Sequence, residues 1–170
     1  IFRLSSLIPD ATIDAALAEH GFIRFDTTLV QVLPLASLQL AHVRAVDLAF
    51  KIEPDVRQAA AWLGQMRGDT SSQTTALQVR WGHCAAHIDA QFAYDASGNR
   101  VARSVAIRED GYVGIYDVGT PEACRNRGYA TALLARQLRT AQDSGAHTAY
   151  LQVEPDNPSR RIYERFKIGR

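Results

Sequence analysis

The stretch Val118–Thr131, with the sequence VGTPEACRNRGYAT, decides the fold of this chain. The strand before it runs into a turn, and the turn opens the strongest helix, from Tyr129 to about Ser144. The apolar residues of that helix form one stripe, made up of Ala130, Leu133, Leu134, Leu138 and Ala141. A strand that turns into a helix points several unpaired backbone N–H groups at one spot, with the positive end of the helix dipole behind them. The sequence therefore predicts an anion-binding turn.

The residues of the turn suit a phosphate group. Arg125 and Arg127 add positive charge, Gly128 permits close approach of the backbone, and Ala130 leaves room beside the first helical turn. The alternative is a basic helix start with an ordinary turn glycine. The turn is not a Walker loop, because no Gly-Lys-Ser or Gly-Lys-Thr follows, and it lacks the three glycines of a dinucleotide fingerprint.

Strands and helices are expected on both sides of this turn. Strands are predicted at residues 76–81, 85–94, 101–108, 112–118 and 148–153, with hairpin turn signals at 97–99 and 110–111. Helices are predicted at 35–50, 54–66 and 159–166, and the small polar residues 68–75 are predicted to form a loop. Antiparallel strands followed by a strand–helix–strand unit predict a mixed sheet of the α+β class.

The composition is that of one globular domain. The chain has 170 residues, of which 46% are hydrophobic and 22% charged, with a net charge of +1. This length suffices for a sizeable core, and the near-neutral charge argues against a dedicated nucleic-acid binder. No stretch approaches the ~18 apolar residues of a membrane span. Cys84 and Cys124 are too few for a disulfide scaffold. We therefore expect a cytoplasmic protein with no nucleic-acid or membrane partner.

The turn also resembles a known signature. The run Arg125-Asn126-Arg127-Gly128-Tyr129-Ala130 resembles the acyl-CoA signature of the GNAT acetyltransferase superfamily, which reads Arg or Gln, two residues, Gly, one residue, then Gly or Ala. The resemblance covers roughly residues 76–166. It implies the GNAT acyl-CoA N-acyltransferase fold, a mixed, mostly antiparallel sheet flanked by helices.

The resemblance also suggests how the chain is divided. Residues 35–170 are expected to form the acyltransferase domain, without the family's final strand pair. Residues 1–34 read as strand (1–4), helix (10–19) and strand (28–33), and they are similar to the tail of a preceding GNAT-like half in a tandem member. Because the chain starts at Ile1 and stops soon after the last helix, we expect it to be incomplete at both ends.

For the cofactor, the resemblance implies acetyl-CoA and no metal. In the family, two strands splay apart to admit the pantetheine arm, which here implies residues 116–120 and 149–153. The implied contacts with the cofactor are Val118, Gly119, Thr120, Arg125, Asn126, Arg127, Gly128, Tyr129, Ala130, Thr131, Asn157 and Arg160. Asn157 lies six positions before Tyr163 where the family has seven, so Asp156 is an alternative for its place. Arg160 could instead be a solvated surface arginine.

The mechanism that the resemblance implies is direct attack of a primary amine on acetyl-CoA in a ternary complex, without a covalent intermediate. Tyr163 is the candidate general acid that protonates the leaving sulfur, because a phenol with a pKa near 10 is protonated at neutral pH. Its alternative role is packing on the sheet. Asp117 and Glu154 are the candidate general bases. Asp117 could instead bind a cationic acceptor or face solvent, and a solvent relay could replace either carboxylate.

The sequence also allows other interpretations of the site and of the function. His83 and His87 could share one face of a strand, but no third ligand with suitable spacing accompanies them, so we expect no metal site. The acceptor is expected to be the amine of a small molecule or a peptide, and a homodimer is possible. The alternative function is a catalytically inactive GNAT-like module that binds or senses acyl-CoA, or only scaffolds a partner. A phosphate-binding protein unrelated to CoA is a third reading.

Overall fold

A computed structural model of the chain describes residues 12–23, 25 and 28–168. The strand predicted at residues 1–4 lies outside the described residues. The central element is a six-stranded sheet in the order β1-β6-β5-β4-β3-β2. Its strands are β1 (Leu29–Pro34), β2 (Ala49–Glu53), β3 (His87–Tyr94), β4 (Arg100–Glu109), β5 (Tyr112–Gly119) and β6 (Thr148–Val153). Every neighbouring pair is antiparallel except β5 and β6, which are parallel, and this confirms the predicted mixed, mostly antiparallel sheet.

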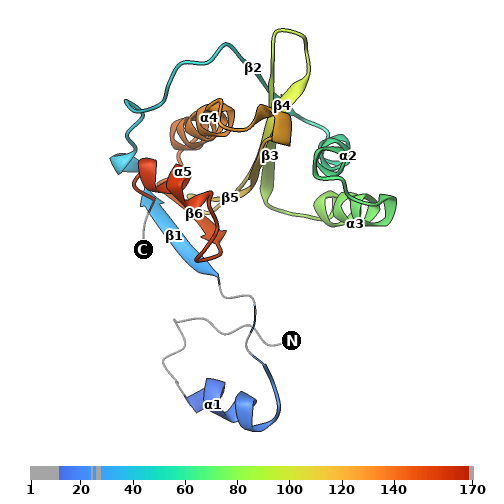
Figure 1. Cartoon of the computed structure of the whole chain (residues 1–170), viewed down its shortest axis with the longest axis vertical. Coiled ribbons are helices and arrows are strands. Elements are labelled where there is room, and N and C mark those ends of the chain that lie inside the picture. Colours follow the sequence, from blue (N-terminus) through green and yellow to red (C-terminus); the bar gives the residue numbers. More distant parts are fainter. Residues whose placement is uncertain (1–11, 24, 26–27, 169–170) are drawn as a thin grey trace.

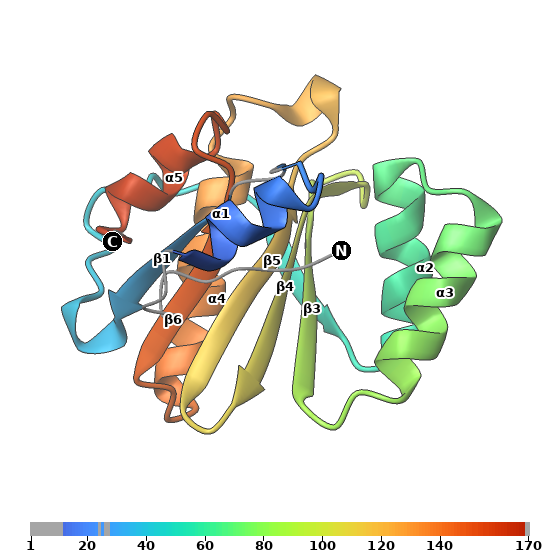
Figure 2. The same ribbon diagram turned by 90° about the horizontal axis from the view of Figure 1, so that it is seen from below.

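Helices cover both faces of the sheet (Figure 1). Helices α2 (Val56–Arg67) and α3 (Ser71–Gly82) lie on one face, and α4 (Tyr129–Asp143) and α5 (Arg160–Arg165) lie on the other. Figure 2 shows α4 behind β5 and β6, and α2 and α3 beside β3. Helix α1 (Thr12–Glu19) stands apart from the sheet in Figure 1, and none of its eight residues is buried.

Helix α4 forms one side of the main core, as its apolar stripe predicts. Leu134 and Leu138 are fully buried and pack in one cluster with Val113, Ile115 and Leu151 of the sheet. On the other face, α2 packs on β3, where the Trp62 and Phe92 rings meet edge to face with centroids 5.5 Å apart. This second layer covers β3 and β4 and leaves the same face of β5 and β6 uncovered, where Tyr112 is 50% exposed.

Residues 71–82 correct the sequence prediction. They form the helix α3, where a loop (68–75) and a strand (76–81) were expected. Thr70 begins the helix with a capping box: Thr70 Oγ1 accepts a hydrogen bond from the Gln73 N–H, and Gln73 Oε1 accepts one from the Thr70 N–H. Leu77 is then buried against β3 and β4. The cap and the buried leucine together favour the helix.

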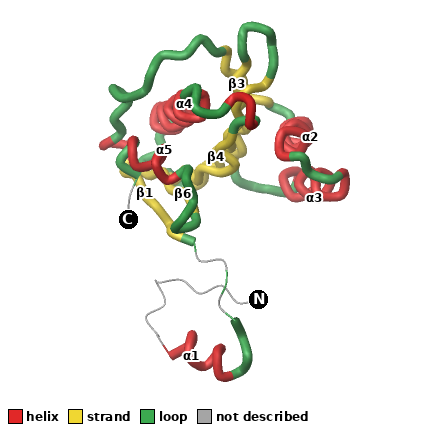
Figure 3. The backbone as a smooth tube through the Cα atoms, viewed as in Figure 1, coloured by secondary structure: helices red, strands yellow, loops and turns green. Residues whose placement is uncertain are grey.

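Residues 35–50 also differ from the prediction. In place of a helix, a short 3-10 turn (Leu35–Ser37) leads into an extended segment that reaches β2. Leu38, Leu40 and Val43 of this segment pack against the core cluster that contains α4, and Figure 3 shows the segment passing around α4. The apolar residues of this extended segment thus pack against the α4 core and do not form the buried face of a separate helix.

The strand predicted at residues 28–33 is present as β1. It pairs with β6 along its whole length, from Leu29 opposite Val153 to Pro34 opposite Thr148, and so forms one edge of the same sheet as the downstream residues. Its Leu33 belongs to the main core. Within the described residues, no helix is both long and apolar enough to cross a membrane.

Candidate functional site

The strands β5 and β6 separate before either of them ends. Their parallel ladder has four residue pairs, from Tyr112 opposite Thr148 to Ile115 opposite Leu151. Beyond that last pair, β5 continues to Gly119 and β6 to Val153. We call the space between these two unpaired strand ends the β5–β6 opening. Backbone N–H and C=O groups that face it are not used by a partner strand, so they are available to a bound molecule.

A β-bulge bends β5 at this point. Opposite β4, Gly119 pairs with Arg103 and Tyr116 pairs with Val105, so that Asp117 and Val118 together oppose a single residue. Asp117 has a φ of +53°, which is uncommon for a residue with a side chain. A bulge increases the local bend of a strand, and this one lies just beyond the last β5–β6 pair, Ile115 opposite Leu151.

The loop that follows β5 leads into the N-terminus of α4, where the sequence predicts an anion site. Asn126 (φ +60°) and Gly128 (φ +81°) are both left-handed, and Gly128 is the N-cap of α4, where no side chain of the described residues caps the helix. The first-turn N–H groups, those of Tyr129, Ala130 and Thr131, are therefore left for a ligand. A Cβ placed on Gly128 would meet no atom closer than Val46 Cγ1 at 3.9 Å, so the space above the backbone is open.

The side chains of the two arginines in the loop are available to bind an anion. Arg125 and Arg127 are exposed, and in the part of the chain that the structure describes neither has a hydrogen bond or ion pair from its side chain. Val118, Gly119 and Thr120 lie at the end of β5, on the strand side of the same loop, and are half-buried. The predicted strand and loop residues are thus continuous along the β5–β6 opening and the start of α4.

The candidate general acid lies on α5. Tyr163 is only 8% exposed and packs in the main core cluster. Burial raises the pKa of its hydroxyl, so the phenol stays protonated at neutral pH. Both the catalytic and the packing interpretations of this side chain are compatible with its burial.

Asn157 and Arg160 have partners in the connection between β6 and α5. Asn157 Oδ1 accepts a hydrogen bond from the Ser159 N–H at 2.9 Å, and Arg160 Nη1 donates to the Pro155 carbonyl oxygen at 2.6 Å. These bonds shape the connection that leads from the β5–β6 opening into α5. Glu154, the first residue after β6, is exposed, and among the described residues its carboxylate has no ion-pair partner.

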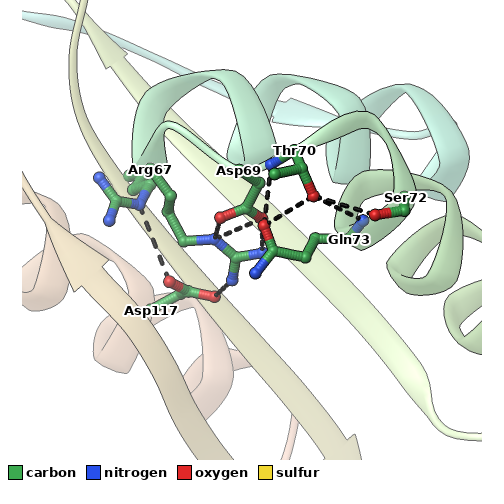
Figure 4. A network of polar contacts seen from close by, with 7 residues as sticks. Arg67, Asp69, Thr70, Ser72, Gln73 and Asp117 are labelled. Atoms are coloured by element: carbon green, nitrogen blue, oxygen red, sulfur yellow. Dashed lines mark hydrogen bonds and ion pairs between the residues drawn. The ribbon is translucent and has the colours of Figure 1, made fainter.

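The carboxylate of Asp117 is engaged by two arginines. Arg67 Nη1 donates to Asp117 Oδ2 at 2.7 Å, and Arg103 Nε lies 3.8 Å from Oδ1. Arg67 also binds Asp69 through its Nε and Nη2 atoms (Figure 4). This network ties the connection between α2 and α3 to the bulge in β5. A carboxylate with these partners is less available as a base than the sequence led us to expect.

The environment shifts the pKa values of both arginines. Burial alone would lower the pKa of Arg67, but its hydrogen bonds and charge contacts with Asp69 and Asp117 outweigh burial and raise it. Burial lowers the pKa of Arg103, partly offset by the charge of Asp117. Arg103 Nε is buried without a hydrogen-bond partner in the described structure. The carboxylate of Asp117 is therefore the main neutralising charge for Arg103, and it shares the charge of Arg67 with Asp69.

The sequence did not predict a groove that lies beside this network. It has a volume of about 670 Å³ and is lined by Arg67, Asp69, Gln73, Ala76, Val79 and Arg80. Its size falls within the range of about 300–1,000 Å³ that is typical of small-molecule sites. Four of the lining residues lie on α3, which was expected to be a loop and a strand. The capping box at Thr70 and Gln73 is the sequence signal that could have revealed this helix.

Two tyrosines at the opening were also missed. Tyr116 of β5 and Tyr150 of β6 bring their hydroxyl oxygens to 3.2 Å from each other. The two positions are 34 residues apart in sequence, and only the parallel pairing of β5 with β6 places them side by side. His83 and His87 do not meet at one site: His83 caps the end of α3, and His87 Nε2 lies 2.9 Å from Asp89 Oδ1.

The arrangement of strands, loop and helix agrees with comparisons to known proteins. Residues 55–167 match the family model of the acetyltransferase (GNAT) family. A GCN5-related N-acetyltransferase from Kribbella flavida has a similar structure, with a TM-score of 0.66 at 19% identity over 92% of this chain and 59% of that one. One from Sphaerobacter thermophilus gives a TM-score of 0.64 at 18% identity, over 94% of this chain and 53% of that one.

A third similar structure is matched over most of its own length. An aminoglycoside acetyltransferase from an uncultured soil metagenomic sample gives a TM-score of 0.54 at 20% identity, over 71% of this chain and 90% of that one. A search of curated proteins finds no match to this chain. Sequence identities this low show similarity of fold alone. The chain spans between half and two thirds of the length of the first two structures. The family model, in contrast, covers well over half of the chain, and this protein therefore belongs to the acetyltransferase (GNAT) family.

Proposed function

We propose that this protein is an N-acetyltransferase that transfers the acetyl group of acetyl-CoA to a primary amine by direct attack in a ternary complex. The observation that carries the proposal is the joining of two features on one strand: β5 leaves β6 after Ile115, and it then leads into the uncapped N-terminus of α4. The first feature offers free backbone groups to an extended amide-bearing arm, and the second offers N–H groups to a diphosphate.

The residues of the site suit acetyl-CoA as the co-substrate. In the proposal, the backbone of Val118, Gly119 and Thr120 binds the pantetheine arm and polarises the thioester carbonyl. The loop and first helical turn, residues 125–131, bind the diphosphate through backbone N–H groups and the two arginines. The left-handed Gly128 and the open space above it support this assignment, because a phosphate must come close to the backbone there.

The catalytic roles follow from the environment of each side chain. Tyr163, with its pKa raised by burial, donates a proton to the sulfur that leaves. Glu154, whose carboxylate is exposed, takes a proton from the ammonium form of the acceptor through water, so that the amine can attack. We assign Asp117 to positioning rather than to proton transfer, since Arg67 and Arg103 occupy its carboxylate. Asn157 and Arg160 act by fixing the connection that carries Tyr163.

The second candidate is a GNAT-like module that binds acyl-CoA without transferring it. The engagement of the Asp117 carboxylate by arginines favours this candidate, because it removes one of the two acidic groups at the opening. The two candidates share the cofactor site and differ only in whether a free amine is acylated.

One experiment separates these functions. Release of free CoA thiol is followed with acetyl-CoA and a panel of amines, and binding of CoA and of ATP is measured in parallel by thermal shift. Amine-dependent release of thiol supports the acetyltransferase. Stabilisation by CoA without release of thiol for any amine supports the binding module. Stabilisation by ATP and not by CoA contradicts both.

A further inference from the structure

The hydroxyl pair of Tyr116 and Tyr150 has no role in the function proposed above. The hydroxyl oxygens are 3.2 Å apart, and the rings stand nearly perpendicular, at 88°, with centroids 6.4 Å apart. Gly114 of β5 makes the approach possible: a Cβ on it would lie 2.6 Å from Tyr116 Cε2 and 2.8 Å from the Tyr150 hydroxyl oxygen. A side chain at position 114 would therefore push the two phenols apart.

The pair stands at the β5–β6 opening. Tyr116 is the first residue of β5 beyond the last ladder pair, Ile115 opposite Leu151, and Tyr150 lies directly opposite Gly114. Side chains alternate between the two faces of a strand. Since Ile115 and Leu151 are buried in the core with α4, Tyr116 and Tyr150 lie on the opposite face. That is the face that α2 and α3 leave uncovered, and Tyr116 is followed by Asp117 of the arginine network.

The pair has the right chemistry to move a proton. Two phenol groups carry two protons, and only one of these lies in the bond between them, so the pair keeps one outward proton and free lone pairs. Burial, and next the hydrogen bond with Tyr150, raise the pKa of Tyr116 to about 12. The phenol of Tyr116 is thus not a base by itself. A hydroxyl can nevertheless accept a proton on its oxygen while it passes its own proton to the next hydroxyl.

We propose that Tyr116 contacts the acceptor amine and, with Tyr150, forms a relay that carries a proton from the attacking nitrogen to solvent. This inference rests on the proposed acetyltransferase function. Within this pair, Tyr116 would be a catalytic residue, because it touches the reacting nitrogen. Tyr150 would be a positioning residue that acts through Tyr116.

The relay completes the proton balance of the reaction. Glu154 takes the first proton, which turns the ammonium group into a neutral amine. The nitrogen then bonds to the thioester carbonyl carbon, and the carbon–sulfur bond breaks with its electron pair going to sulfur, which receives a proton from Tyr163. The attached nitrogen still carries one proton more than an amide. Tyr116 oxygen accepts it, Tyr116 gives its own proton to Tyr150, and Tyr150 gives its proton to water. Glu154 then loses its proton to water and Tyr163 regains one from water, so that one proton is released in each turnover.

The test compares conservative variants at three tyrosines of one face. Tyr116→Phe, Tyr150→Phe and the double variant each remove one or both hydroxyls. Tyr112→Phe is the matched control, because Tyr112 lies on the same face of β5 but stacks edge to face on His147, with centroids 4.9 Å apart. The measurements are kcat and KM with acetyl-CoA and the best amine of the panel, and the affinity for CoA by calorimetry.

We expect each of the two pair variants to lower kcat by roughly 100-fold, as loss of an acid–base group does, with unchanged CoA affinity. The double variant should be no slower than the worse single variant, because both break the same relay. Tyr112→Phe should keep the wild-type rate. Full activity of Tyr116→Phe, multiplied losses in the double variant, or an equal loss in Tyr112→Phe would each overturn the relay while leaving the proposed function intact. A wild-type protein that binds CoA but acylates no amine would overturn the proposed function and the relay with it.

Discussion

Replacing Gly128 by alanine tests the phosphate-binding loop most directly. Gly128 has a φ of +81° at the N-cap of α4, and a Cβ added there would lie 3.9 Å from Val46 Cγ1, which is an ordinary contact. The substitution therefore creates no collision within the protein. Its cost to folding is the left-handed conformation of a residue with a side chain, about 1–2 kcal/mol.

The cost to binding should be larger than the cost to folding. A methyl group on Gly128 keeps a phosphate away from the first-turn N–H groups of α4. A hydrogen bond to a charged group contributes about 1.5–3 kcal/mol. The loss of one such bond should therefore raise the Kd for acetyl-CoA by roughly 10- to 100-fold. We expect Gly128→Ala to fold, to melt at a slightly lower temperature, and to bind acetyl-CoA at least about 10-fold more weakly.

Gly98 supplies a matched control. It has a φ of +80° in the turn between β3 and β4, and a Cβ there would meet no atom within 4 Å. Gly98→Ala should therefore lose about the same free energy of unfolding as Gly128→Ala, about 1–2 kcal/mol, and should keep the wild-type Kd for acetyl-CoA. The measurements are urea unfolding and isothermal titration calorimetry. If both alanine variants bind acetyl-CoA as the wild type does, the loop does not hold the diphosphate and the reasoning fails.

Four further predictions concern other parts of the molecule. Tyr163→Phe should lower kcat by about 10- to 100-fold with an unchanged Kd for CoA; a full rate would remove its role as the acid. Asp117→Asn should lower the free energy of unfolding by about 1–3 kcal/mol, because it leaves the partly buried Arg103 without its main neutralising partner; a lost rate at full stability would instead make Asp117 the base. Thr70→Ala should cost about 1 kcal/mol in urea unfolding by removing the capping box of α3, and no change would mean that the cap is not needed. Because the pKa of Tyr116 is about 12 in the folded protein and about 10 in an unfolded chain, the unfolded state loses its proton first. Stability should therefore fall as the pH rises from about 10 to about 12, less steeply in Tyr116→Phe; equal slopes would contradict the partial desolvation of that hydroxyl beside Tyr150.

The sequence predicted those elements whose patterns are strong and local. The apolar stripe of α4 and the alternation in residues 148–153 each correspond to one buried face, and the structure has a helix and a strand there. Helix α3 was missed because Leu77, Val79 and Trp81 alternate like residues of a strand. The start of α3 consists of small polar residues typical of a loop. Only the capping box and the burial of Leu77 distinguish the two cases, and burial depends on the rest of the fold.

The candidate site could be predicted only where it is local in sequence. The turn with Gly128 and its helix is one continuous stretch, and its anion-binding character follows from backbone geometry. The arginine partners of Asp117 could not be foreseen, because Asp117 lies on β5 whereas Arg67, 50 positions earlier in the chain, is the last residue of α2. The same holds for Tyr116 and Tyr150, which meet only through the pairing of β5 with β6.

The edge position of β1 has a consequence for the order in which the protein can form during synthesis. Val30 and Val32 lie opposite Gln152 and Tyr150, so the sheet cannot be completed until residues near 150 have left the ribosome. Until then, β1 remains unpaired, and a chaperone or a neighbouring nascent chain can bind it. A recombinant fragment cut to residues 55–167, the part that matches the family, would lack this strand and would leave β6 with an open edge prone to aggregation.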